Sequence, residues 1–323
     1  MNPPRFLFKF TKEAAEFNAK ILTDNNFDLD KIIRQQHPSQ ISYSSEFKSS
    51  FQLQELLHSH PLWSRLKDIL ENGASFPLNE ISDSDRKLDL TFHVNRGNHK
   101  SATVHHQRLQ EIITEDVERG FMLPLPVSVL HSIPNASLAP LGCVKQSTLD
   151  ALGNRAFKHR MTHDQSFPGP SGLSVNLRVQ NEKLPPIMYS FVLMRSIHYI
   201  ISLRQRHPTT KVFICKFDID AAYHRCSFSS KTAFESMTIF AGLLLVALRM
   251  TFGGAPCPSI WGVISETITD IGTHYFKTNV GYTPSCMIPF LINWTVLYPC
   301  LIQFLSVELG SYQYLFHLTI KGR

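Results

Sequence analysis

Apolar residues recur at helical spacing through most of the first 125 residues. Within residues 11–22 they stand at Ala14, Phe17 and Ile21, and Thr11 precedes them as a favourable N-cap. The same spacing predicts further helices, at residues 51–57, 62–70 and 103–119. We therefore expect residues 1–125 to form a helical N-terminal region.

A period-two alternation follows and predicts a β-hairpin. Residues 141–146 and 157–164 are expected to be its two strands. Alternation places Lys158 and Arg160 on the same face of the second strand. Two cations on one strand face suit a polyphosphate, although an ordinary solvated strand face has the same pattern. The proline-rich residues before the hairpin, 122–140, are expected to be an extended linker.

Longer apolar patterns predict helices in the second half of the chain, at residues 187–206, 232–249 and 258–275. The second of these is expected to be buried, because residues 240–248 are apolar on nearly every side. Gly253 and Gly254 stand just before the third helix. Paired glycines let a backbone approach a ligand closely, and a helix N-terminus can bind anions.

Residues 211–223 carry the pattern most typical of a catalytic site. Residues 212–215 form a short apolar run that predicts a buried strand, and Asp218 and Asp220 follow it. Mg²⁺ prefers oxygen ligands and usually binds one or two carboxylates together with substrate phosphates. The pattern therefore fits a metal site at the end of a strand, and it fits equally well a carboxylate that caps the next helix.

Composition narrows the classes of protein that the chain can represent. Its 323 residues are 43% hydrophobic and 18% charged, enough for a sizeable core and about two domains. A net charge of +6 fits a polyanionic partner but is not specific for one. The six cysteines form no C-x-x-C pair, so the sequence predicts neither a zinc site nor a disulfide framework. The N-terminus lacks the apolar core of a secretory signal, which favours an intracellular location.

Histidines gather between residues 93 and 106, near Arg96 and Lys100. Metal coordination is one explanation, but no matching cysteine or carboxylate spacing accompanies them. We therefore expect residues 93–100 to be a basic loop that faces solvent or nucleic acid.

Several stretches, in their order along the chain, resemble motifs of the reverse transcriptases (RNA-directed DNA polymerases) of retroelements. Residues 160–166 with Asn176 resemble the basic fingers strand, which has an Arg-x-x-x-Asp pattern and a trailing Asn. Residues 217–223 resemble the first catalytic motif, Asp-x-x-x-Ala-Tyr. Residues 249–256 resemble the Phe-Gly…Pro turn before the next palm helix. The closest likeness is to elements with an Asp-x-Asp-Ala-Ala-Tyr-Arg-Arg variant, in which His224 here replaces the first Arg.

The resemblance spans residues 138–276 and implies an α+β fold. The helical N-terminal region would be followed by an incomplete right-hand polymerase fingers and palm with a small antiparallel sheet. By the same resemblance, Asp218 would bind both catalytic Mg²⁺ ions, and the backbone carbonyl of Ile219 would be a second contact at this nucleotide site. Template-primer nucleic acid and a deoxynucleoside triphosphate would be the partners.

The resemblance also assigns the nucleotide contacts. Arg160 and Lys158 would hold the triphosphate. Tyr223 would lie beneath the incoming sugar and exclude a 2′-hydroxyl. Gly253 and Gly254 would let the backbone lie against the nucleotide and the template base.

The chain departs from the family where a second carboxylate motif is required. It contains no Asp-Asp pair, and its last aspartate is Asp270. One carboxylate cannot hold two cations that repel each other, so we expect this chain alone not to polymerise. The primer grip, thumb, connection and nuclease regions are also missing.

Residues 277–323 form an apolar tail, and residues 286–305 are long enough to span a membrane. Pro289 and Pro299 make a span the less favoured interpretation. Packing against the palm is another, and read-through without a selected structure is the one we favour.

The sequence thus supports a truncated reverse-transcriptase-like protein, inactive alone, whose ancestral activity is RNA-directed DNA polymerisation. A non-catalytic remnant that binds nucleic acid through Lys158, Arg160 and residues 93–100 is the main alternative. A membrane-anchored protein is the third.

Overall fold

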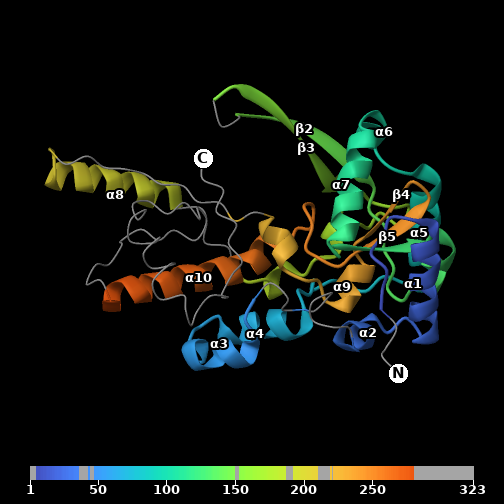
Figure 1. Cartoon of the computed structure of the whole chain (residues 1–323), viewed down its shortest axis with the longest axis horizontal. Helices are drawn as coiled ribbons and strands as arrows, with labels where there is room; N and C mark the ends of the chain where they lie inside the picture. The colour runs from blue at the N-terminus through green and yellow to red at the C-terminus, as the bar shows by residue number, and fades with distance from the viewer. Residues whose placement is uncertain are drawn as a thin grey trace. The chain divides into compact units, whose positions relative to one another are not determined.

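The structure, a computed structural model, describes residues 5–35, 43, 47–149, 153–186, 192–209, 219 and 221–279. Within this part the fold is α+β, with helices mostly toward the N-terminus and two small antiparallel sheets (Figure 1). Contacts divide the chain into two compact units, which we describe separately. Unit 1 comprises Met1–Ser45, Asp68–Leu184 and Tyr223–Cys257, and unit 2 comprises Glu46–Lys67, Pro185–Ala222 and Pro258–Arg323.

Unit 1 begins with the helix predicted from the first apolar pattern. Helix α1 covers Lys12–Asp24, and the Thr11 hydroxyl accepts a hydrogen bond from the Ala14 backbone N–H at 3.2 Å. The buried Asn18 of this helix donates to the backbone oxygen of Pro124 at 3.2 Å, which ties α1 to the first strand. Further helices of unit 1 are α2 (Leu29–Gln35), α5 (Asp83–Arg96), α6 (Lys100–Val104), α7 (His106–Glu118) and α9 (Ser230–Phe234).

A three-stranded antiparallel sheet lies at the centre of unit 1. Its strands are β1 (Met122–Pro126), β4 (Met237–Phe240) and β5 (Leu243–Ala247), in the order β1-β5-β4. Strand β1 contradicts the predicted linker, which gives way to a strand and the 3-10 helix η1 (Val127–Ser132). Its prolines are tolerated because an edge strand leaves some backbone N–H groups outside the ladder.

The helix predicted over residues 232–249 is wrong. Helix α9 ends at Phe234, and the rest of the run is the β4–β5 hairpin. An apolar run that is buried on every side is also typical of a central strand, and periodicity cannot distinguish the two. Ala241 and Gly242 decide the outcome, because their φ angles of 49° and 79° form a two-residue hairpin turn.

The second sheet is the hairpin predicted by alternation. Strands β2 (Leu141–Leu149) and β3 (Arg155–His163) pair antiparallel and extend further toward the tip than predicted. The register places Lys158 opposite Gln146 and Arg160 opposite Val144, so the two cations share a face, as predicted.

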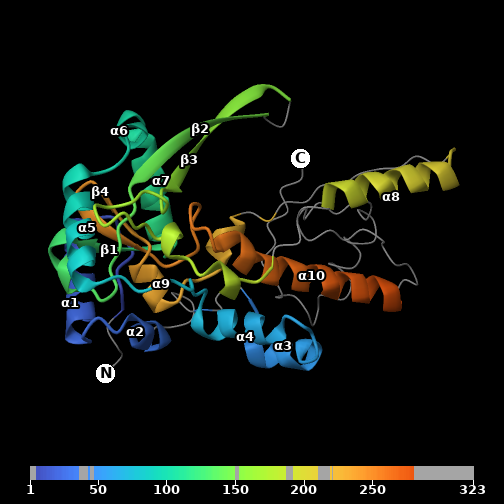
Figure 2. The ribbon, with the colours of Figure 1, turned by 180° about the vertical axis from the view of Figure 1, so that it is seen from behind.

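The hairpin projects from the body of unit 1 in both views (Figures 1 and 2). Its base joins a core shared with α6, α7 and the sheet, formed by Ala102, Leu109, Ile113, Val117, Met122, Leu141, Met161, Phe240 and Leu245.

The basic loop predicted over residues 93–100 is wrong in its extent, because only residues 97–99 lie outside a helix. Residues 83–96 form α5, and α6 begins at Lys100. The histidines pack against rings: His99 lies 5.6 Å from the Phe167 ring, and His106 stacks on Phe240 at 4.8 Å. Residues 94–97 and Lys100 are nevertheless exposed, so this stretch faces solvent as expected.

Unit 2 is helical in its described part. It contains α3 (Ser50–Leu57), the start of α4 (Trp63–Asn72), α8 (Val192–Arg206) and most of α10 (Cys257–Asn279), in agreement with the helices predicted there. The His60 imidazole lies 3.1 Å from the Asp270 carboxylate on α10. Among the described residues, none of the helices combines the length and apolar character needed to cross a bilayer. The predicted strand at 212–215 and the apolar segment 286–305 lie outside the described residues.

Candidate functional site

The glycine turn before α10 closes against the end of strand β3. The His163 backbone N–H donates to the Phe252 oxygen at 3.1 Å. Gly253 has a φ of 129°, and a Cβ built there would lie 1.8 Å from the His163 oxygen. Only glycine fits this conformation and this close contact. The turn is therefore fixed by backbone geometry to the strand that carries Arg160.

Asn176 fastens the same turn from a third segment. It lies in the 3-10 helix η2 (Asn176–Arg178), which is followed by η3 (Asn181–Lys183). Its side-chain nitrogen donates to the Gly253 oxygen at 2.7 Å, and its side-chain oxygen accepts from the Ala255 N–H at 2.8 Å. This trailing asparagine thus has a definite structural role, which is to hold the glycine turn in shape.

Three side chains form a cluster at the surface beside this turn, which we call the stack although its two ring planes are inclined by 43°. The Arg160 guanidinium lies 5.9 Å from the centre of the Phe252 ring, and the Tyr223 ring lies 5.1 Å from the same ring. Tyr223 belongs to the short 3-10 helix η4 (Ala222–Arg225). Phe252 is 48% exposed and Arg160 is exposed. A cation and two aromatic rings arranged in this way can contact the phosphate and the ring or sugar of a nucleotide.

The projecting hairpin carries a second group of cations and an aromatic ring. The Phe157 ring is 54% exposed and lies between the Lys145 ammonium at 4.2 Å and the Arg155 guanidinium at 5.6 Å. Lys158 is exposed on the opposite face. The described residues of the two strands include no carboxylate. Desolvation, and then the positive charges of His105, Lys145 and Arg108, lower the pKa of His159, which is consistent with a positive local field.

The acidic residue of the Arg-x-x-x-Asp pattern has structural contacts. The Asp164 carboxylate lies 2.9 Å from the His99 imidazole and accepts from the Ser166 N–H at 3.3 Å. The neighbouring His163 is buried, and burial, followed by the charge of His224, lowers its pKa to about 3. Its imidazole is therefore neutral and contributes no charge to the surface above it.

The two predicted glycines differ in their surroundings. Gly253 is exposed, whereas Gly254 is buried, with a built Cβ 2.7 Å from the Phe76 ring. Ile219 is buried at 8% exposure and belongs to unit 2. Asp218, the predicted metal ligand, lies outside the described residues.

The sequence placed Phe252 only within the Phe-Gly…Pro turn motif and did not predict that its ring contacts both Arg160 and Tyr223. An aromatic residue immediately before two glycines was the available signal. Asn176 was noted only as part of a motif. Its contacts span 77 and 79 residues of sequence, so spacing alone could not reveal them.

Asp218 has no Asp-Asp partner in the sequence, and the described residues hold no group of three His, Cys, Asp or Glu side chains able to bind a metal ion. Comparison of the chain with protein-family models and with curated proteins found no match.

Proposed function

We propose that this chain is a reverse-transcriptase-like protein that binds template-primer and a deoxynucleoside triphosphate but does not polymerise by itself. The observation that carries the proposal is the stack of Arg160, Phe252 and Tyr223 above the glycine turn. These residues come from three of the stretches that resemble the family, and they lie together in one unit.

Each member of the stack has a chemical role in nucleotide binding. Arg160 offers a guanidinium to the triphosphate, since its fork of N–H donors matches phosphate oxygens. Tyr223 and Phe252 offer ring faces to the sugar and base. The exposed backbone at Gly253 allows the nucleotide to approach closely.

The proposal includes no polymerisation step. Two-metal nucleotidyl transfer needs a set of carboxylates that holds both ions, and the sequence contains no Asp-Asp pair that would complete such a set with Asp218. Mg²⁺ bound at Asp218 together with nucleotide phosphates would still be compatible with binding.

The hairpin favours a second candidate, a protein that binds nucleic acid without nucleotide. A cation–aromatic–cation tip at Lys145, Phe157 and Arg155 is suited to single-stranded nucleic acid, where bases stack on exposed rings. Addition of dTTP separates the two candidates. It should tighten template-primer binding in the first and leave it unchanged in the second.

We expect Lys158→Gln and Arg160→Gln each to weaken binding of labelled poly-rA/oligo-dT to the full chain. Each lost phosphate contact should reduce the slope of log affinity against log salt by about 0.7 to 0.9. Fluorescence anisotropy across a salt series measures both quantities. The matched controls are Lys20→Gln and Arg119→Gln, which alter exposed cations on α1 and after α7. Wild-type affinity and slope in both hairpin variants would count against the proposal.

A further inference from the structure

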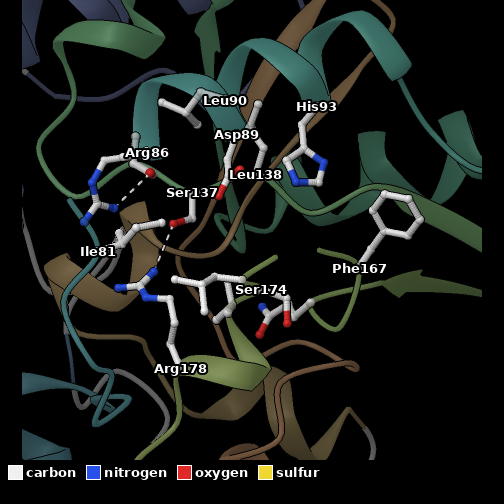
Figure 3. A pocket seen from close by; sticks show the side chains of 14 residues that line it. Ile81, Arg86, Asp89, Leu90, His93, Ser137, Leu138, Phe167, Ser174 and Arg178 are labelled. Atoms are coloured by element: carbon white, nitrogen blue, oxygen red, sulfur yellow. Dashed lines mark hydrogen bonds between the residues drawn. The ribbon is translucent and has the colours of Figure 1, made fainter. Parts of the chain in front are cut away.

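Unit 1 contains a pocket that the proposed function does not use. It lies between α5 and the segment from Gln165 to Arg178. Figure 3 shows Arg86 and Arg178 on one side of the pocket and His93 and Phe167 on the other, with Leu138 between them. Neither Arg160 nor Phe252 belongs to its lining.

Gln165 is the first sign that this pocket binds a ligand. Its side chain lines the pocket and is 1% exposed. Neither the amide nitrogen nor the amide oxygen has a hydrogen-bond partner among the described residues. A buried amide with both ends unpaired is costly, so such a group in a pocket calls for a partner that donates and accepts hydrogen bonds.

Arg86 is the second sign. Its side chain, half-buried on α5, donates one hydrogen bond, to the Ala136 oxygen at 3.1 Å, and no carboxylate of the described residues forms an ion pair with it. Burial, and then the charge of Arg178, lowers the pKa of Arg86, and the carboxylates of Glu235, Glu80 and Asp83 partly oppose this shift. A guanidinium has five N–H donors, so most of those on Arg86 remain available.

Arg178 and Asp89, the other charged residues of the pocket, already have partners, whereas the His93 imidazole, whose pKa burial lowers, has a buried Nδ1 without a partner among the described residues. Arg178 donates to the Glu235 carboxylate at 3.0 Å. Asp89 accepts from the Ser171 backbone N–H at 2.9 Å and from its hydroxyl at 2.6 Å. Arg86 is therefore the cation that a ligand can neutralise.

We propose that this pocket binds a small molecule with an oxyanion, carboxylate or phosphate, on Arg86 and an amide-like group on Gln165. Leu90 and Leu138 add apolar surface to the lining of the pocket. A short amido-carboxylate has this chemistry. The inference does not depend on the proposed function, because nucleic-acid binding and this pocket involve different residues.

Thermal unfolding of the full chain tests the proposal with named probes. Malonamate and succinamate carry both groups at two lengths, acetate and inorganic phosphate carry an oxyanion alone, and sodium chloride controls for ionic strength. We expect at least one amido-carboxylate to raise Tm saturably, by about 3 °C near saturation, and to exceed acetate. If inorganic phosphate raises Tm by as much as the amido-carboxylate or more, the oxyanion that Arg86 binds is a phosphate.

Two variants assign the effect to residues. Arg86→Gln should abolish the shift for every probe, whereas the exposed Arg119→Gln should retain it. Gln165→Met keeps the side-chain length and removes both unpaired atoms. It should raise Tm without a probe and remove the advantage of the amides over acetate. No saturable shift with any probe, or an undiminished shift in Arg86→Gln, would overturn the proposal.

Discussion

Gly253→Ala is expected to destabilise unit 1 by at least about 3 kcal/mol, the sum of left-handed backbone strain and a steric clash. The new Cβ would lie 1.8 Å from the His163 oxygen, and this neighbour is backbone that cannot rotate away. The turn must therefore move, and its contacts with Asn176 and β3 would be lost. Urea unfolding of the purified variant measures the change in the free energy of unfolding.

Gly242→Ala is the matched control for this prediction. Gly242 also has a positive φ, 79°, but a built Cβ meets no atom within 4 Å. Its substitution should cost only the backbone strain, about 1 kcal/mol or slightly more. If Gly253→Ala and Gly242→Ala reduce the free energy of unfolding equally, the turn at Gly253 does not depend on its close contact with β3.

Arg178→Met is expected to cost about 3 to 5 kcal/mol, because it leaves a buried carboxylate without its cation. The Arg178 and Glu235 side chains are 3% and 0% exposed, and they lie 3.0 Å apart. Arg178 also donates to the Asn79 oxygen at 2.8 Å. The control is Arg119→Met, which breaks an exposed ion pair with Glu115 and should change stability by about 0.5 kcal/mol or less. Urea unfolding again supplies the measurement.

The double variant Arg178→Met/Glu235→Met should recover most of the loss, because no buried charge remains unpaired.

The loss of stability in the single variant Arg178→Met should also depend on pH. Burial raises the pKa of Glu235, and the charge and hydrogen bond of Arg178 oppose that rise. A carboxyl with a raised pKa binds its proton more tightly when folded, so stability falls as pH rises between the unfolded and folded pKa values. Without Arg178 the pKa rises further, and the deficit should be larger at pH 8 than at pH 5. A deficit independent of pH would exclude Glu235 as its source.

Elements with strong local signals were predictable from sequence. The β2–β3 hairpin follows from alternation, and α1 follows from a threonine cap before an amphipathic run. The β4–β5 hairpin was missed because residues 240–248 are apolar in every direction. In such an apolar segment the spacing of apolar residues does not distinguish a helix from a strand. The turn residues Ala241 and Gly242, with their positive φ angles, were more informative.

The candidate site was partly predictable, for a similar reason. Motif order identified Arg160, Tyr223 and Gly253, but it could not reveal that Phe252 lies between the first two. It also gave no sign of the Arg178–Glu235 pair, whose members are 57 residues apart. Contacts of that kind arise from tertiary packing, and no local pattern encodes them.

Primer extension on poly-rA/oligo-dT tests the central claim most directly. The full chain and its Asp218→Asn variant would be compared with Mg²⁺ and with Mn²⁺, and template-primer binding would be recorded in the same samples. We predict no extension by either protein and salt-sensitive binding by both. Extension by the wild-type chain that is lost in Asp218→Asn would contradict the account, because it would mean that a complete metal centre forms. Absence of binding would contradict it as well.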